Sequence, residues 1–171
     1  MQKIYKIEDN IMYVPFETLP EDARIWIYQS NRKFSEEEII EIEKEVKAFV
    51  EEWAAHGTGL QASFKIKYNR FIILAVNQEI QSATGCSIDA SVRFIQQLQD
   101  KYEVDLLDKM NVTFKLGDHI AHKNLIEFKK MAKEKAVSPN TIVFNNLVNT
   151  VGEWQDFWEV PAHESWHSRF F

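Results

Sequence analysis

Apolar positions near the start of the chain follow first a strand pattern and then a helical one. Residues 23–29 (ARIWIYQ) are rich in β-branched and aromatic side chains, which favour a strand. Between residues 35 and 55, apolar side chains recur at spacings of three and four and share one helical face: Ile39, Ile42, Val46, Phe49 and Trp53. Ser35 and Glu38 form a capping box that marks where this helix begins.

The next stretch, residues 60–76, predicts a hairpin. Apolar and polar residues alternate from Leu60 to Tyr68, as in a strand with one buried face. Asn69 suits the left-handed backbone of a tight turn. The run 71–76 (FIILAV) is apolar throughout, which indicates an inner strand that is buried on both faces.

A second helix and another strand follow the hairpin. Ser87 is a candidate cap for a helix that extends to Tyr102, and its apolar stripe would consist of Ile88, Val92, Ile95, Leu98 and Tyr102. Residues 111–116 (NVTFKL) alternate like a strand. The order over residues 23–116 is strand, helix, strand, strand, helix, strand, which is that of the ferredoxin-like βαββαβ fold. We therefore predict an α+β core with an antiparallel sheet and both helices on one face.

The remaining residues, 117–171, predict a helical C-terminal extension packed on that core. Asp118 is a candidate cap for a helix that reaches about Lys135. A further helix is expected to end at Pro161. The tail, residues 165–171, is rich in aromatic side chains, so we expect it to dock onto the domain.

Composition fits a single globular domain, residues 1–171, with 45% hydrophobic residues. The formal net charge of −6 disfavours a nucleic-acid partner, because phosphate binding needs a dense basic face. A single cysteine, Cys86, points to the reducing cytoplasm. The sequence has neither a basic leader followed by an apolar run nor 18 consecutive apolar residues, so we expect no signal peptide and no membrane span.

The predicted topology suggests one place for a ligand. We expect the first and third strands to be central and parallel, so that their C-terminal ends and both helix N-termini meet at one edge and attract an anion. Candidate binding residues follow those two strands: Gln29, Arg32, Asn77, Glu79, Thr84, Cys86, Ser87 and Asp89. Ordinary capping and loop chemistry is the alternative explanation for these residues.

The C-terminal string at residues 163–167 (HESWH) matches the H-E-x-x-H pattern of zinc hydrolases. On a helix, this pattern places His163 and His167 one turn apart as zinc ligands, with Glu164 as general base. A catalytic zinc ion is usually bound by three protein ligands, and no third ligand of the usual kind follows His167. Incidental histidines in a docked aromatic tail are the alternative interpretation.

Residues 24–29 (RIWIYQ), 83–89 (ATGCSID) and 166–171 (WHSRFF) are recognisable strings rather than catalytic motifs. With them, most of the chain resembles an uncharacterised bacterial family of small proteins that are often labelled "ABC transporter ATPase". The resemblance implies a soluble single-domain protein of unproven activity. The label conflicts with the sequence, because none of the five glycines gives the phosphate-binding pattern G-x-x-x-x-G-K-[ST].

Taken together, the patterns predict a soluble cytoplasmic protein with a non-catalytic function, namely binding of a small anion or of a protein partner. Two alternatives remain open. One is a zinc-dependent hydrolase that uses His163 and His167, and the other is a homo-oligomeric subunit that self-associates through its sheet or aromatic tail. ATPase activity is disfavoured, and neither nucleic acid nor a membrane is expected as a partner.

Overall fold

The computed structural model describes three stretches of the chain, residues 13–56, 61–79 and 83–171. It is an α+β structure with two antiparallel sheets, which confirms the predicted class. Within the described stretches, no helix combines the length and the apolar character that crossing a lipid bilayer requires.

The chain divides into two compact units. Unit 1 comprises Met1–Leu107 together with Asn149–Gly152, and unit 2 comprises Asp108–Val148 together with Glu153–Phe171. The boundary expected at residue 116 therefore lies inside unit 2. The reason is that the last strand of the predicted core belongs to unit 2.

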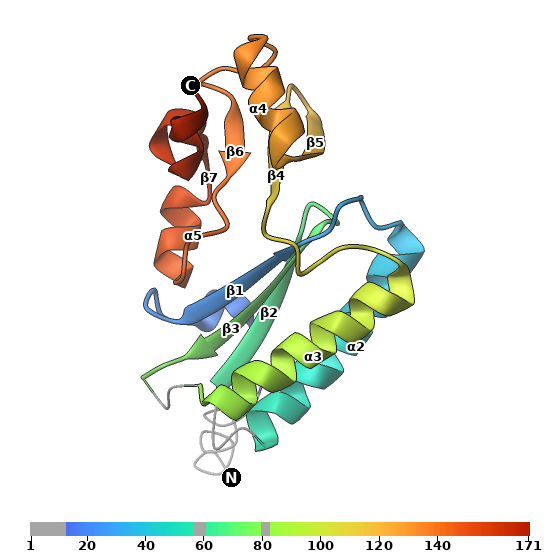
Figure 1. Cartoon of the computed structure of the whole chain (residues 1–171). Helices are drawn as coiled ribbons and strands as arrows, with labels where there is room; N and C mark the ends of the chain where they lie inside the picture. Colours follow the sequence, from blue (N-terminus) through green and yellow to red (C-terminus); the bar gives the residue numbers. More distant parts are fainter. Residues whose placement is uncertain (1–12, 57–60, 80–82) are drawn as a thin grey trace. The chain divides into compact units, whose positions relative to one another are not determined.

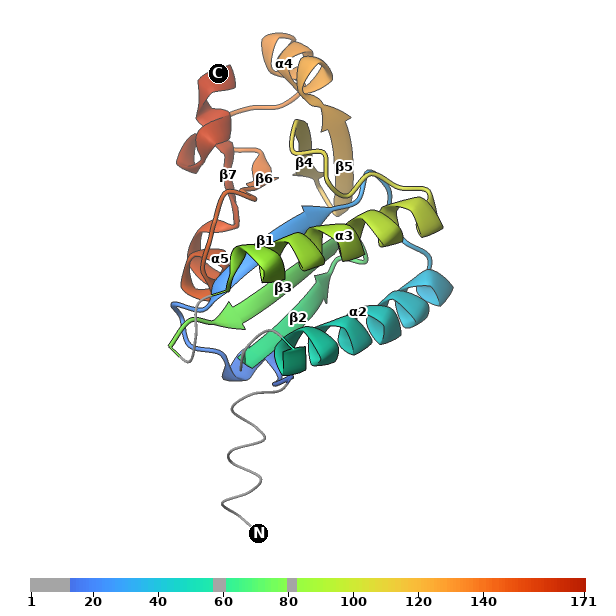
Figure 2. The same cartoon turned by 60° about the horizontal axis from the view of Figure 1, so that its bottom comes forward.

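Unit 1 is built on a three-stranded sheet whose order is β1-β3-β2. Its strands are β1 (Arg24–Gln29), β2 (Gln61–Lys67) and β3 (Phe71–Asn77), and β3 pairs antiparallel with both neighbours. The helices α2 (Glu36–His56) and α3 (Gly85–Tyr102) cover one face of this sheet (Figures 1 and 2). A short 3-10 helix, η1 (Phe16–Thr18), precedes β1.

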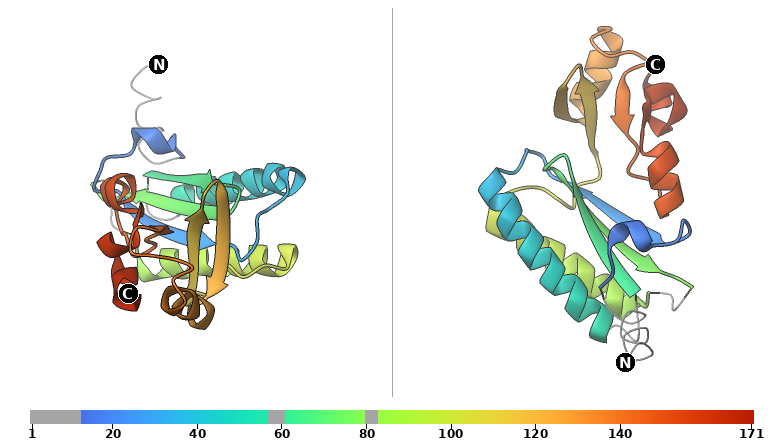
Figure 3. Two further views of the ribbon diagram at one scale, coloured as in Figure 1. Left: turned by 90° about the horizontal axis from the view of Figure 1, so that it is seen from above. Right: turned by 180° about the vertical axis from the view of Figure 1, so that it is seen from behind.

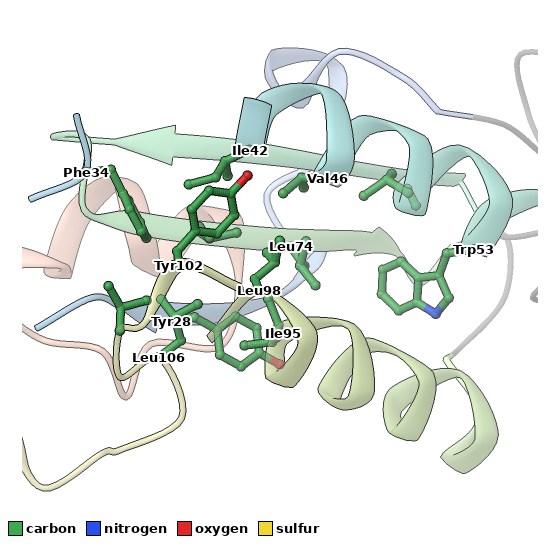
Figure 4. Close-up of a cluster of buried hydrophobic side chains, with 14 of the residues drawn as sticks. Tyr28, Phe34, Ile42, Val46, Trp53, Leu74, Ile95, Leu98, Tyr102 and Leu106 are labelled. Atoms are coloured by element: carbon green, nitrogen blue, oxygen red, sulfur yellow. The ribbon is translucent and has the colours of Figure 1, made fainter. Parts of the chain in front are cut away.

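The central strand β3 is buried along its whole length, as its uninterrupted apolar run predicts. Its helix-facing side chains join those of the two helices and of β1 in one apolar core (Figure 4), which includes Tyr28, Ile42, Val46, Leu74, Ile95 and Leu98. The turn before β3 places Tyr68 and Asn69 at φ of 55° and 51°, so the predicted left-handed turn at Asn69 is confirmed.

The buried face of α3 matches the predicted stripe at Ile95, Leu98 and Tyr102 but also includes two small polar residues. The buried residues of this helix are Ser87, Ser91, Ile95, Leu98 and Tyr102. Val92, expected on the inner stripe, is 38% exposed. Ser91 forms a hydrogen bond with the largely buried hydroxyl of Tyr28, and burial raises the pKa of that hydroxyl. The buried phenol thus obtains the polar partner that it needs inside the core.

The fourth strand of the predicted ferredoxin-like core is the main correction to the fold. β4 (Asn111–Leu116) does form, but it pairs with β5 (His119–Asn124) in the sheet of unit 2 instead of joining β1, β2 and β3. Gly117 adopts a φ of 62° and allows the tight turn that joins the two strands. The first residues of the helix predicted from Asp118 to about Lys135 therefore form strand β5, whereas its later part is confirmed as helix α4 (Leu125–Lys133).

Unit 2 holds a four-stranded antiparallel sheet with the order β5-β4-β6-β7 (Figure 3). Its further elements are α4 (Leu125–Lys133), β6 (Ile142–Phe144), α5 (Val151–Phe157, whose first residues count with unit 1), β7 (Glu159–Pro161), η2 (Ala162–Glu164) and η3 (Trp166–Phe170). The side chain of Asn124 caps α4 by accepting from the Glu127 N–H at 2.8 Å. The helix expected to end at Pro161 stops at Phe157.

The aromatic tail docks within unit 2, as its composition predicts. Phe128 of α4 is fully buried, and the Phe170 ring of η3 lies edge-on to it with centroids 5.9 Å apart. Val112, Phe114 and Val160 belong to the same apolar cluster. The tail therefore supplies part of the core of unit 2.

Candidate functional site

The predicted anion site at one sheet edge does not assemble, because β1 and β3 are antiparallel. Their C-terminal ends lie at opposite ends of the sheet, so the expectation of parallel central strands is wrong. Arg32 accordingly lies beside the C-terminal end of α3, whereas Thr84 caps its N-terminal end. With 18 residues between these ends, they are separated by about 27 Å.

Arg32 has a structural role at its own end of unit 1. Its guanidinium forms two 2.9 Å hydrogen bonds with the Glu38 carboxylate and donates to the Tyr102 carbonyl at 2.8 Å. Glu38 also closes the predicted capping box, since it accepts from the Ser35 N–H at 2.9 Å. These interactions, led by the bond from Arg32, lower the pKa of Glu38 to about 2. Arg32 thus joins the start of α2 to the end of α3.

Four other predicted ligand residues also lie outside the lining of the two pockets described below: Gln29, Asn77, Glu79 and Asp89. Asn77, 6% exposed at the end of β3, donates to the Gln61 side chain at 2.6 Å and accepts from the Glu79 N–H at 2.9 Å. Asp89 is exposed on α3. Gln29, 6% exposed, lies at the other end of the sheet, where it is paired with Phe71.

The remaining three predicted residues, Thr84, Cys86 and Ser87, line a groove between α2 and α3. The groove has a volume of about 750 Å³, and its lining consists of Glu45, Ala48, Phe49, Glu52, Trp53, Thr84, Cys86, Ser87, Ala90, Arg93, Phe94 and Gln97. Ala48 and Ala90 contribute only methyl groups, one from each helix, which leaves room between the helices. We call this space the α2–α3 groove.

Aromatic rings from both helices line the α2–α3 groove. Phe49 and Phe94 stack with centroids 4.3 Å apart and an interplanar angle of 3°, and Trp53 lies 5.6 Å from Phe49. The indole N–H of Trp53 donates to the Ser87 carbonyl at 2.9 Å, which ties the end of α2 to the start of α3. Figure 4 shows Trp53 projecting from α2 toward α3. Periodicity identified Phe49 and Trp53 only as an inner stripe, and it did not single out Phe94.

Charge differs between the two walls of the groove. Glu45 on α2 is already paired with Lys101 and accepts from the Tyr102 hydroxyl at 2.8 Å. Burial, followed by Glu45, raises the pKa of the Tyr102 hydroxyl. On α3, none of the ion pairs found among the described residues uses Arg93. The α3 wall therefore carries an available cation as well as the positive end of the helix dipole.

The capping of α3 gives a first prediction. Thr84 Oγ1 accepts from the Ser87 N–H at 3.1 Å, so Thr84→Ala should lower the free energy of unfolding by about 1 kcal/mol. Thr84→Ser keeps the hydroxyl and should retain most of that stability. Urea denaturation of the three proteins measures the effect. Equal losses in both variants would show that the methyl group, and not the cap, matters.

The two histidines of the H-E-x-x-H string lie in separate 3-10 helices, so they lack the one-turn spacing on a single helix that the zinc alternative requires. His163 is exposed in η2, His167 is 1% exposed in η3, and Ser165 separates them in an extended conformation. The Nδ1 atom of His167 is 2.7 Å from Ser165 Oγ, and its ring stacks on Trp166. Within the described stretches, no three His, Cys, Asp or Glu side chains group so as to hold a metal ion.

No protein-family model, curated protein or solved structure matches the chain. The geometry of the α2–α3 groove is therefore the basis for the proposal below.

Proposed function

We propose that unit 1 is a non-catalytic binding module for a small organic anion with an apolar body. The observation that carries the proposal is the α2–α3 groove of about 750 Å³ with its aromatic lining. Sites for small ligands are commonly about 300–1,000 Å³ and combine apolar walls with a few polar groups. The apolar part of the ligand would lie on Phe49, Trp53 and Phe94.

An anionic head group fits the α3 wall best. Arg93 lines this wall and can pair with the head group. Of the two carboxylates on the opposite wall, Glu45 is engaged by Lys101. A ligand oriented with its charge toward α3 avoids Glu52, which lies across the groove.

Support for a non-catalytic role comes from the groove lining. Cys86 is exposed, but no histidine is among the described residues that line the groove with it. A thiol nucleophile ordinarily needs a base or cation within hydrogen-bond reach, and the cation of the groove, Arg93, lies seven residues from Cys86 along α3, about 10 Å by the helical rise. An exposed, unpaired thiol also fits the cytoplasmic location that we propose for the protein. We retain the resemblance to the small bacterial family as a proposal of kinship, without the ATPase label.

Calorimetric titration with three ligands of equal chain length tests the proposal. Decanoate should bind, decanol should bind more weakly and decylammonium weakest, with the two ions below their micelle concentrations and decanol below its solubility limit. Arg93→Gln should weaken decanoate about fivefold, which is the size of a partly exposed ion pair, and leave decanol unchanged. Shortening decanoate by two methylene groups should weaken its binding to the wild type roughly tenfold.

Arg32→Gln is the matched control, because it removes the same charge beside the C-terminal end of α3, outside the groove lining. It should leave decanoate binding unchanged in protein that remains folded. Equal binding of all three head groups would reject the anionic part of the proposal. If the wild type binds none of the three ligands and gives the same titration as Phe94→Ala, the groove is rejected as a small-molecule site. That result would favour a protein partner there.

A further inference from the structure

A second site lies on unit 2, where apolar side chains are exposed around a pocket of about 460 Å³. Leu147 is 63% exposed and Phe157 is 55% exposed, and Trp166 completes the apolar wall. The carboxylates of Glu153 and Glu164 stand among the lining residues. We call this space the acidic pocket. Exposed apolar side chains gathered around a hollow are a common sign of an interaction surface.

A complementary surface is present on α4 of the same unit. Ile126 is 80% exposed, and it lies on the opposite side of the helix from Phe128, which is fully buried. Lys130 lies four residues after Ile126, and Lys133 lies three residues after Lys130, so the three side chains share one face of the helix. We call them the α4 stripe. The only ion pair found for either lysine in the described residues joins Lys130 to exposed Glu134 at 3.9 Å, and such surface pairs contribute little.

Charge is distributed unevenly along unit 2. Residues 108–148, which include α4, carry seven lysines and four acidic residues. Residues 153–171, which form most of the acidic pocket, carry four acidic residues and one arginine. Two copies of the chain would therefore attract each other when the α4 stripe of one faces the acidic pocket of the other.

We propose that the acidic pocket binds the α4 stripe of a second copy of this chain. Ile126 enters the apolar wall formed by Leu147 and Phe157, and Lys130 and Lys133 face the carboxylates. Each copy uses its α4 stripe toward one neighbour and its acidic pocket toward another, so the contact is head-to-tail. Such contacts produce rings where the rotation closes and open chains where it does not.

Sedimentation velocity of the full chain between about 10 and 500 µM is the first test, over a range suited to a weak interface. The weight-average sedimentation coefficient should rise with concentration, and added salt should reduce the rise. Ile126→Glu and Leu147→Glu should each weaken association roughly tenfold or more. Both side chains are mostly exposed, so the folded structure should tolerate the changes. Ile40→Glu, at a 56% exposed position of α2, is the matched control and should associate like the wild type.

Mixing the two variants separates a head-to-tail contact from other modes of association. Ile126→Glu retains the acidic pocket and Leu147→Glu retains the α4 stripe, so an equimolar mixture should form a one-to-one complex and nothing larger. A symmetric contact of two α4 stripes or of two acidic pockets would not be restored by mixing. A two-fold pair with reciprocal stripe–pocket contacts would show in the wild type as a dimer that grows no further, and that result would also overturn the head-to-tail proposal. Wild-type protein that stays monomeric throughout, a mixture without the complex, or a control as defective as Ile126→Glu would each overturn the proposal. None of these outcomes bears on the α2–α3 groove.

Discussion

Replacing Phe128 with alanine should lower the free energy of unfolding of unit 2 by about 3–5 kcal/mol, the usual cost of removing a buried phenylalanine ring. Phe128 is fully buried. Its ring meets Phe114 of β4 edge-on at a centroid distance of 5.1 Å, and Phe170 of the tail at 5.9 Å. The variant therefore loses contacts to the sheet and to the tail together. Because whole domains are stable by only about 5–15 kcal/mol, unit 2 should be largely unfolded in many conditions.

Phe157→Ala is the matched control for this prediction, because it removes the same side chain from a position that is 55% exposed. It should change stability by less than about 0.5 kcal/mol. Urea denaturation gives the magnitude, and hydrogen exchange of peptides from β4 and β6 assigns the loss to unit 2. Similar losses in both variants would contradict the position of Phe128 at the centre of that core.

The elements of unit 1 could be predicted from the sequence because their signals are local. The capping box at Ser35 and Glu38 forms as expected, and the apolar run of β3 marks a buried central strand. The partner of β4 could not be predicted in the same way. An alternating pattern such as 111–116 specifies which face of a strand is buried, but not which strand lies beside it. The Gly117-Asp118 pair was the available signal for a tight turn between β4 and β5. The same Asp118 can equally be interpreted as a helix cap, so the signal is ambiguous.

The inner face of α3 illustrates a second limit of sequence patterns. Ser87 and Ser91 are buried, whereas Val92 is 38% exposed. A search for apolar periodicity cannot find an inner face that includes hydroxyl groups. The hydroxyl of Tyr28 explains one of them, because a buried phenol requires a polar neighbour such as Ser91. Phe94, which the apolar periodicity also missed, stacks on Phe49 in the groove.

Only the part of the α2–α3 groove near the start of α3 could be predicted from the sequence. Thr84, Cys86 and Ser87 were identified by their position before a helix, and they do line the α2–α3 groove. Arg32 was assigned to the same site through an assumed parallel pairing, which the antiparallel register of β1 and β3 contradicts. Relative strand direction depends on the path of the chain between strands, and no residue pattern within the strands encodes it.

The stability of unit 2 should fall as the pH is lowered from about 6.5 to 4, because His167 is buried as a neutral imidazole. Burial, followed by the charge of Arg169, lowers the pKa of His167 to about 4. In the unfolded chain, a histidine has a pKa of about 6.5. Between these values, the unfolded state binds the proton and the folded state does not, so protonation favours unfolding. The free energy of unfolding should be lower by about 3 kcal/mol near pH 4, and above about pH 7 His167 should cause no loss of stability.

His167→Gln tests this origin of the pH dependence, and His163→Gln is the matched control because it removes an exposed imidazole from the neighbouring turn. Urea denaturation at pH 7 and pH 4.5 gives two free energies for each protein. The difference between them should shrink by about 2–3 kcal/mol in His167→Gln relative to the wild type, whatever the absolute stability of that variant. An unchanged difference would show that His167 is protonated in the folded state. That result would also contradict a tail docked with its imidazole between Trp166 and Phe128, since a charged ring enclosed there would require a counter-ion.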